Sequence, residues 1–314
     1  MTQSTIPDLP PGASARVVDG RASIILDVTG LDEAAADARE TAARAAAAAA
    51  GIAEVRVART AERRGRRLIA VASGKGGVGK STVSANLAVA LRRRGRAAGL
   101  VDADIYGPSQ PRLLGTEGQQ PAARDSRMIP VEGAGGVPLL SMGMLVPGGQ
   151  AIAWRGPMAA NALGQMIDGH WDAVDTLLLD LPPGTGDVQL TMIQKHRPAG
   201  AVIVSTPQDL ALIDAARAID LFAKAGVPVI GLVENMAGYA CPHCGEVSDP
   251  FGQGGAEAEA ARLGIPFLGR IPLSIGIRRA SDAGEPPALG NGPDAAAFDA
   301  VAEQVETWLA VQGG

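Results

Sequence analysis

The chain has 314 residues, of which 46% are hydrophobic and only 3% aromatic, and its formal net charge is −5. Such a composition predicts a sizeable core of Ala, Val, Leu and Ile, and its net acidity disfavours nucleic-acid and anionic-lipid surfaces. No apolar run approaches the roughly 20 residues of a membrane span, and the first residues lack the basic and apolar segments of a secretory signal. We therefore expect a cytoplasmic protein with neither nucleic acid nor a membrane as its partner.

The first part of the chain predicts a tail, a small domain and a linker. Residues 1–12 are rich in proline and polar residues and are expected to be disordered. Residues 59–66 belong to an arginine-rich stretch that predicts a solvated linker. Between them, residues 13–58 predict a small α+β domain of the order ββαβ: a hairpin from Ala15 to Asp27 with its turn at Asp19-Gly20, an alanine-rich helix from Asp32 to Ala50, and a strand from Ile52 to Ala58.

Residues 67–314 predict an α/β domain with a mostly parallel, doubly wound sheet and helices on both faces, because apolar strand patterns alternate with helical ones. Ligands of such sheets bind at the carboxyl ends of the strands. The stretch from Gln110 to Gly149 is rich in Gly and Pro, and its Met142, Met144 and Leu145 are interpreted as core or loop residues. The expected strands are Leu68–Ala72, Ala97–Val101, Thr176–Asp180, Ala201–Ser205, Pro228–Val233 and Pro266–Ile271, and the expected helices are Lys80–Arg94, Ala159–Asp168, Leu210–Ala225 and Ala256–Leu263.

A phosphate-binding loop follows the strand Leu68–Ala72, in the sequence SGKGGVGKST. It fits GxxxxGK[ST], in which glycines let backbone N–H groups surround a phosphate and the lysine neutralises phosphate charge. The same letters fit the dinucleotide motif GxGxxG, but Lys80 and Ser81 have a role only in the phosphate loop, where Ser81 would ligate Mg²⁺. Nucleotide contacts are therefore expected from Gly74, Lys75, Gly76, Gly77, Val78, Gly79, Lys80, Ser81 and Thr82.

Three aspartates follow predicted strands. Asp102 and Asp104 can face one site, although strand-end capping explains Asp102 equally well. Asp180 ends an apolar strand before the segment LPPGTGD, a pattern typical of a Walker B strand and switch II. We expect Asp180 beside Mg²⁺, through a water, because Mg²⁺ retains much of its hydration.

The two cysteines of the chain, Cys241 and Cys244, form a single CxxC motif. Such a pair is compatible with a redox dithiol, half of a zinc site or half of a cluster site. Two thiolates do not complete a four-ligand zinc or iron–sulfur site, whereas a symmetric dimer would supply four. His243, between them, is interpreted as part of the turn.

The combination of GKGGVGKST, DADIYGPS, DLPPGTGD, STPQD, ENM and YACPHCG resembles the Mrp/ApbC family of iron–sulfur cluster carriers, within the MinD/ParA/NifH-like ATPases with a deviant Walker A loop. The resemblance covers roughly residues 67 to 290. It implies an ATPase with slow basal turnover and a [4Fe–4S] cluster bridged by Cys241 and Cys244 of two subunits. Recipients would be apo iron–sulfur proteins, and scaffold proteins are possible donors.

The same resemblance assigns individual roles. Lys75 would reach across a homodimer to the partner's nucleotide, Asp104 would orient the attacking water, and Asp102 would lie nearer the metal shell. Asn235 would read the adenine edge, and Pro207 would line the base pocket. The small domain, residues 13–58, resembles the later half of an iron–sulfur assembly domain.

Two other functions share these motifs. A MinD/ParA-like positioning ATPase has the same phosphate loop and the same lysine at Lys75. Its membrane-binding members should end in a basic amphipathic helix, whereas this chain has Glu303 and Glu306 there. In the other alternative, the CxxC pair bridges a structural zinc ion.

Overall fold

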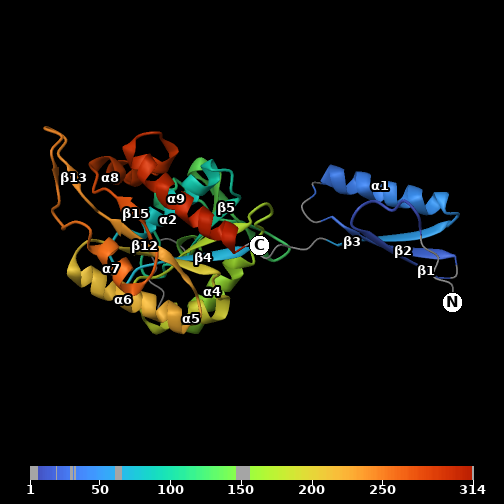
Figure 1. The fold of residues 1–314 in the computed structure, drawn as a ribbon, viewed down its shortest axis with the longest axis horizontal. Coiled ribbons are helices and arrows are strands. Elements are labelled where there is room, and N and C mark those ends of the chain that lie inside the picture. The colour runs from blue at the N-terminus through green and yellow to red at the C-terminus, as the bar shows by residue number, and fades with distance from the viewer. Residues whose placement is uncertain are drawn as a thin grey trace. The chain divides into compact units, whose positions relative to one another are not determined.

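The computed structural model describes residues 6–18, 20–28, 31, 33–60, 66–145 and 156–312. The chain divides into two compact units, Met1–Gly65 and Arg66–Gly314, whose elements are labelled in Figure 1. Asp19 and Asp32, expected at a turn and at a helix start, lie outside the described residues, as do residues 61–65 of the expected linker.

The smaller unit is a three-stranded sheet with one helix. Its sheet has the order β1-β2-β3, with β1 antiparallel and β3 parallel to β2. Alternate residues of β2 are buried, because successive side chains of a strand point to opposite faces. Two of them, Ala22 and Ile24, pack with Ala43 and Ala47 of the helix. The elements are β1 (Ala13–Val18), β2 (Arg21–Asp27), α1 (Glu33–Ala49) and β3 (Glu54–Thr60).

Two expectations for this unit differ from the structure. Ile6 is only 6% exposed and belongs to the unit's core, so the expected disorder of residues 1–12 does not describe residues 6–12. An apolar side chain gains stability from this burial although its neighbours are prolines and polar residues. Arg59, expected in the linker, lies in β3 and pairs with Asp37 at 2.6 Å and Glu40 at 2.7 Å.

The larger unit is built on an eight-stranded sheet with the order β15-β12-β11-β4-β10-β5-β9-β8. All neighbouring strands are parallel except β8 and β9, which are antiparallel. The strands are β4 (Arg67–Ala72), β5 (Ala98–Asp102), β8 (Val131–Gly133), β9 (Val137–Ser141), β10 (Thr176–Asp180), β11 (Gly200–Ser205), β12 (Val229–Asn235) and β15 (Phe267–Ile271).

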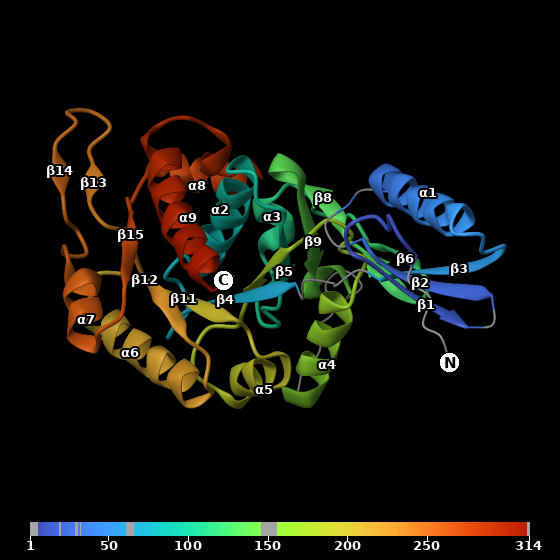
Figure 2. The ribbon, with the colours of Figure 1, turned by 45° about the vertical axis from the view of Figure 1, so that its right-hand side comes forward.

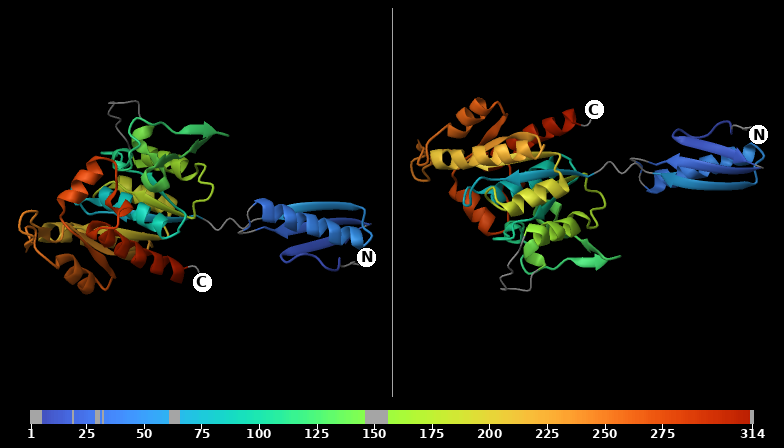
Figure 3. Two further views of the ribbon diagram at one scale, coloured as in Figure 1. Left: turned by 90° about the horizontal axis from the view of Figure 1, so that it is seen from above. Right: turned by 90° about the horizontal axis from the view of Figure 1, so that it is seen from below.

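Helices cover both faces of this sheet, as Figures 2 and 3 show. On one face, Ile69 and Val71 of β4 pack with residues of α2 and α9 such as Leu87 and Phe298. On the other, the intervening alanines of β4 join a core with residues of α4, α5, α6 and α7. Both faces of the central strands are buried, which explains their continuous apolar runs. The helices are α2 (Lys80–Arg93), α3 (Gln110–Leu113), α4 (Gly156–Ile167), α5 (Asp187–His196), α6 (Asp209–Lys224), α7 (Gly255–Leu263), α8 (Ile275–Asp282) and α9 (Pro293–Val311).

The doubly wound fold is confirmed, and the stretch after Asp102 contains more structure than the sequence predicted. Residues 110–145 include α3, β8, β9 and a small hairpin of β6 (Ala122–Arg124) and β7 (Arg127–Ile129). Met142 and Met144 are buried in the core, as interpreted, and residues 146–149 lie outside the described part.

Candidate functional site

The phosphate loop connects β4 to α2, because the strand ends at Ala72 and the helix begins at Lys80. Two of its glycines are required by close contacts. A Cβ at Gly74 would collide with the backbone carbonyl of Asp214 in α6, and one at Gly79 would collide with the amide of Asn235. Gly79 also has φ +81°, a left-handed conformation that favours glycine. The loop therefore fits closely between two neighbouring elements.

Sheet order brings the three aspartates to this loop. β10 lies between β4 and β5, and Asp180 pairs in register with Asp102 on one side and Val71 on the other. The carboxyl ends of these strands thus meet beside the N-terminus of α2, whose backbone N–H groups favour anions. The sheet order explains why residues far apart in the sequence form one site.

Lys80 is the cation at the centre of this cluster. Its side chain is 5% exposed, and Nζ lies 2.6 Å from Oδ1 of Asp180 and 3.7 Å from Oδ2 of Asp104. Ser84 Oγ donates a second hydrogen bond to Asp180 Oδ1, at 2.8 Å. Lys80 Nζ also lies 3.3 Å from the hydroxyl of Ser81. The lysine expected to neutralise phosphates is held by two carboxylates in this structure.

Asp102 is fully buried beside these charges. Burial, followed by the charge of Asp180, raises the pKa of Asp102 to about 7. Hydrogen bonds from the backbone N–H of Gln110 and from Ser141 Oγ, both at 3.0 Å, oppose this rise. Asp102 also accepts a hydrogen bond from the N–H of Asp104 at 3.2 Å. Both expected roles of Asp102, at a strand end and at a metal shell, are compatible with this position.

The donor set of this cluster fits Mg²⁺, a hard cation that prefers oxygen ligands. The hydroxyl of Ser81 and the carboxylates of Asp102 and Asp180 supply such oxygens, and both carboxylates are buried. A further oxygen, Oε1 of Gln110, is buried and has no hydrogen-bond partner among the described residues. Asp104 Oδ1 accepts hydrogen bonds from the N–H groups of Tyr106 and Gly107, which fix the orientation of its carboxylate.

The segment LPPGTGD, which the sequence predicts as switch II, adjoins the phosphate loop. The N–H of Gly184 donates to the carbonyl of Ser73 at 2.9 Å, and the side chain of Pro183 lies beside Gly76. Lys75 is half-buried in the loop, and its carbonyl accepts a hydrogen bond from Ser73 Oγ at 2.9 Å. The expected reach of Lys75 to a second copy stays a prediction.

A cavity of about 430 Å³ opens beside Gly79 and Thr82. Asn235 lines it and donates from Nδ2 to the carbonyl of Val78 at 2.8 Å, which fixes the amide against the phosphate loop. Pro207 is buried where β11 ends and contacts Gly255 at the start of α7, and it is not among the lining residues of this cavity.

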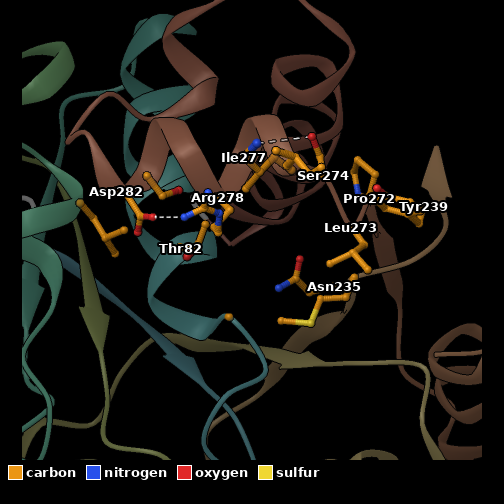
Figure 4. Close-up of a pocket in the computed structure, with 14 residues that line it drawn as sticks. Thr82, Asn235, Tyr239, Pro272, Leu273, Ser274, Ile277, Arg278 and Asp282 are labelled. Atoms are coloured by element: carbon orange, nitrogen blue, oxygen red, sulfur yellow. Dashed lines mark hydrogen bonds and ion pairs between the residues drawn. The ribbon is translucent and has the colours of Figure 1, made fainter. Parts of the chain in front are cut away.

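One wall of this cavity was not predicted from the sequence. It comes from the segment after β15 and from α8, as Figure 4 shows. These residues follow a strand of the parallel sheet. Ligands of such sheets bind at the carboxyl ends of strands, and this rule is the sequence signal that could have found them. The residues of that wall are Pro272, Leu273, Ser274, Ile275, Ile277, Arg278, Ser281 and Asp282.

The cysteines lie on a hairpin that extends from the larger unit (Figure 2), between β13 (Tyr239–Ala240) and β14 (Val247–Ser248). The turn is closed by hydrogen bonds from Cys241 N to Glu246 O and from Gly245 N to Cys241 O, both 2.9 Å. Cys241 is half-buried and Cys244 is exposed, and both thiols are free. Backbone hydrogen bonds from Cys244 and then His243 lower the pKa of the Cys241 thiol, which favours a metal-binding thiolate.

The base of this hairpin joins the cavity wall. Leu273 N donates to Gly238 O at 2.9 Å, and Tyr239, two residues before Cys241, lines the cavity. In the described ranges, no group of three or more His, Cys, Asp or Glu side chains is arranged to hold a metal ion. Two thiolates of one chain therefore need ligands from elsewhere to complete a four-coordinate site.

Among the helices of the described residues, none is both long and apolar enough to cross a bilayer.

Comparison with known proteins gives consistent similarities. Residues 64–306 match the family model described as ParA: NUBPL iron-transfer P-loop NTPase. The chain is 48% identical over 240 residues to an iron-sulfur cluster carrier protein of Pseudomonas fragi, covering 75% of this chain and 83% of that protein. A nucleotide-binding protein from Archaeoglobus fulgidus, solved with ADP, is 40% identical with a TM-score of 0.64, over 72% of this chain and 89% of that one. The cell division ATPase MinD of Pyrococcus furiosus is 25% identical with a TM-score of 0.57, over 78% and 100%.

Proposed function

Because the chain belongs to the family of NUBPL iron-transfer P-loop NTPases, we propose that it is an ATP-hydrolysing carrier that holds a [4Fe–4S] cluster between two copies of itself and transfers it to apoproteins. The observation that carries this proposal is the free pair Cys241 and Cys244 on a projecting hairpin whose base borders the cavity beside the phosphate loop. The name of the Pseudomonas fragi relative supports the same cargo.

ATP binds with its phosphates along Gly74–Thr82, where the backbone N–H groups and Lys80 neutralise their charge. Its base enters the cavity lined by Asn235. Ser81, Asp102 and Asp180 would hold Mg²⁺, Asp180 through a water, and the cation would add charge neutralisation at the phosphates.

Asp104 orients the attacking water. The water oxygen bonds to the γ-phosphorus, the bond from that phosphorus to the bridging oxygen breaks, and ADP, phosphate and a proton are released. Basal turnover is slow, and Lys80 exchanges its ion pairs with Asp180 and Asp104 for contacts with the phosphates when ATP binds.

A homodimer completes the cluster site. Two copies place four thiolates around one axis, the number that a [4Fe–4S] cluster requires. Lys75 of each copy reaches the nucleotide of the other and thereby links ATP binding to the closed dimer. Scaffold proteins load the cluster and apo iron–sulfur proteins receive it. The free thiols fit the reducing cytoplasm.

Anaerobic reconstitution with iron and sulfide tests this proposal. We expect about four irons for every two chains, a charge-transfer absorption band of thiolate-bound iron, and loss of both in Cys244→Ser. Cys244 is exposed, so this variant should keep the wild-type melting temperature. A colourless protein that retains stoichiometric zinc instead would contradict the cluster and support the structural-zinc alternative.

The positioning-ATPase alternative has less support. α9 contains no Lys or Arg between Pro293 and Val311, whereas an amphipathic helix that binds anionic membranes needs cations. Its Glu306 pairs within the protein with Arg94, at 2.7 Å. ATP-dependent cosedimentation with anionic vesicles or with DNA would revive this alternative.

A further inference from the structure

Gln110 is a neutral amide buried among the charges of the nucleotide site. It is the first residue of α3 and follows Asp102 by eight positions, and its side chain is 0% exposed. Burying an amide is unfavourable unless its donors and acceptors find partners. Its contacts therefore indicate what the side chain does.

The donors of Gln110 join three elements of the site. Nε2 donates to Asp180 Oδ2 at 2.8 Å and to the carbonyl of Ser81 at 2.9 Å. Its backbone N–H donates to Asp102 Oδ2 at 3.0 Å. A carbonyl and a carboxylate are acceptors, so these two contacts determine which end of the amide is nitrogen. Gln110 thus connects the start of α2 with the ends of β10 and β5.

This arrangement holds both oxygens of the Asp180 carboxylate. Oδ1 accepts from Lys80 Nζ and Ser84 Oγ, and Oδ2 accepts from Gln110. When Lys80 turns to the phosphates of a nucleotide, Ser84 and Gln110 remain to hold the carboxylate. Gln110 is the partner that also binds the backbone of Ser81, whose hydroxyl belongs to the same oxygen set.

The other end of the amide has a free acceptor. Oε1 of Gln110 is buried and lacks a hydrogen-bond partner within the part of the chain that the structure describes. Covalent geometry keeps Oε1 within a few ångströms of Nε2, and hence close to Asp180 and Ser81. A buried acceptor without a partner is costly and is normally satisfied by a donor such as a bound water. Waters on Mg²⁺ are donors of this kind, because Mg²⁺ retains part of its hydration.

We propose that Gln110 is a positioning residue of the magnesium–nucleotide site: Nε2 fixes Asp180 relative to Ser81, and Oε1 accepts a hydrogen bond from a water on Mg²⁺. The inference rests on the proposed binding of ATP with Mg²⁺. It predicts that Gln110 matters for the magnesium-dependent part of nucleotide affinity and much less for the part that needs no metal.

The test compares ADP binding by calorimetry with Mg²⁺ and with a chelator. Gln110→Met keeps the length of the side chain but removes its donors and acceptor. We expect about a tenfold loss of the affinity gained from Mg²⁺, with chelated affinity within about twofold of the wild type. Gln119→Met, the same change at an exposed site after α3, should match the wild type in both conditions.

A second variant keeps the test informative if Gln110→Met does not fold. Gln110→Glu keeps an accepting oxygen but replaces the donors with a charge that repels Asp180. We expect a lower melting temperature in chelator, and a larger gain from Mg²⁺ and ADP together than the wild type shows, because the cation offsets the repulsion.

The outcomes separate the two claims. The role of Gln110 would be overturned if Gln110→Met lost the same ADP affinity with Mg²⁺ as without it. It would also be overturned if Mg²⁺ and ADP raised the melting temperature of Gln110→Glu no more than that of the wild type. Wild-type protein that binds ADP equally with and without Mg²⁺ would instead contradict the proposed magnesium–nucleotide site.

Discussion

Nζ of Lys80 lies 2.6 Å from Oδ1 of Asp180, and both side chains are buried. The phosphate-loop lysine therefore has a carboxylate partner within the protein. If ATP binds as proposed, Lys80 would exchange this ion pair for contacts with phosphate, and Mg²⁺ would neutralise the carboxylate in its place. Changes to either member of the pair should therefore affect both stability and nucleotide binding.

Lys80→Met should remove nucleotide binding and destabilise the fold. Asp180 would remain buried with only neutral hydrogen-bond donors nearby, and breaking a buried pair in this way costs about 3 kcal/mol or more. Urea denaturation measures the loss. The double variant Lys80→Met/Asp180→Asn should recover much of the stability but none of the binding. Wild-type stability of the single variant would show that the pair contributes little.

Asp104→Asn should slow ATP hydrolysis about a hundredfold and change nucleotide affinity only a few-fold, because a positioned acid or base contributes to the reaction step. The asparagine Oδ1 can still accept from the N–H groups of Tyr106 and Gly107, so the loop should keep its shape. Single-turnover hydrolysis separates the two effects. Unchanged turnover would remove Asp104 as the residue that orients water.

Gly79→Ala should abolish nucleotide binding, because its Cβ would collide with the amide of Asn235. Gly118→Ala is the matched control: Gly118 has φ +78°, close to the +81° of Gly79, but among the described residues no heavy atom beyond Gly118 and its two chain neighbours lies within 4 Å of the place where a Cβ would go. The control should lose only about 1 kcal/mol from backbone strain. Adding Asn235→Ala should restore part of the stability lost in Gly79→Ala. Equal losses of stability in Gly79→Ala and Gly118→Ala would mean that the contact with Asn235 is unimportant.

The buried Asp102 should make stability depend on pH. Its pKa rises from 3.8 to about 7 on folding, so the folded protein binds this proton more tightly than the unfolded chain does. The resulting stabilisation is complete below about pH 4 and is lost as pH rises to about 7. The side chain of Asp102→Asn does not titrate, so nucleotide-free wild type should lose stability relative to this variant across that interval. A difference independent of pH would contradict the raised pKa.

The strands and the phosphate loop could be predicted well where a local sequence pattern determines the structure. The apolar strands β4, β10 and β11 are buried on both faces, so their sequences contain uninterrupted apolar runs. The phosphate loop was identifiable because its glycines and lysine have a fixed spacing. β8 and β9 were missed because they are short and lie within a stretch rich in Gly and Pro.

Contacts within the site were less predictable. Gln110 follows Ser109 in a loop-like sequence, and only the sheet order reveals that it meets Asp180, 70 residues later. The cavity wall from Pro272 to Asp282 depends in the same way on where β15 lies in the sheet. Pro207 follows a strand as expected, yet its carbonyl lies beside Gly255 and it does not line the cavity. Long-range pairing determines these positions, and the local pattern indicates at most that a residue follows a strand.

The most direct test of the central claim is cluster transfer. Reconstituted protein is mixed anaerobically with an apo [4Fe–4S] enzyme, in the presence of an iron chelator, and the recovered enzyme activity is measured. We expect recovery in proportion to the cluster supplied, and none from Cys241→Ser or Cys244→Ser treated identically. Recovery that the chelator abolishes, or that both cysteine variants support equally, would contradict a carrier that holds its cluster between two CxxC pairs.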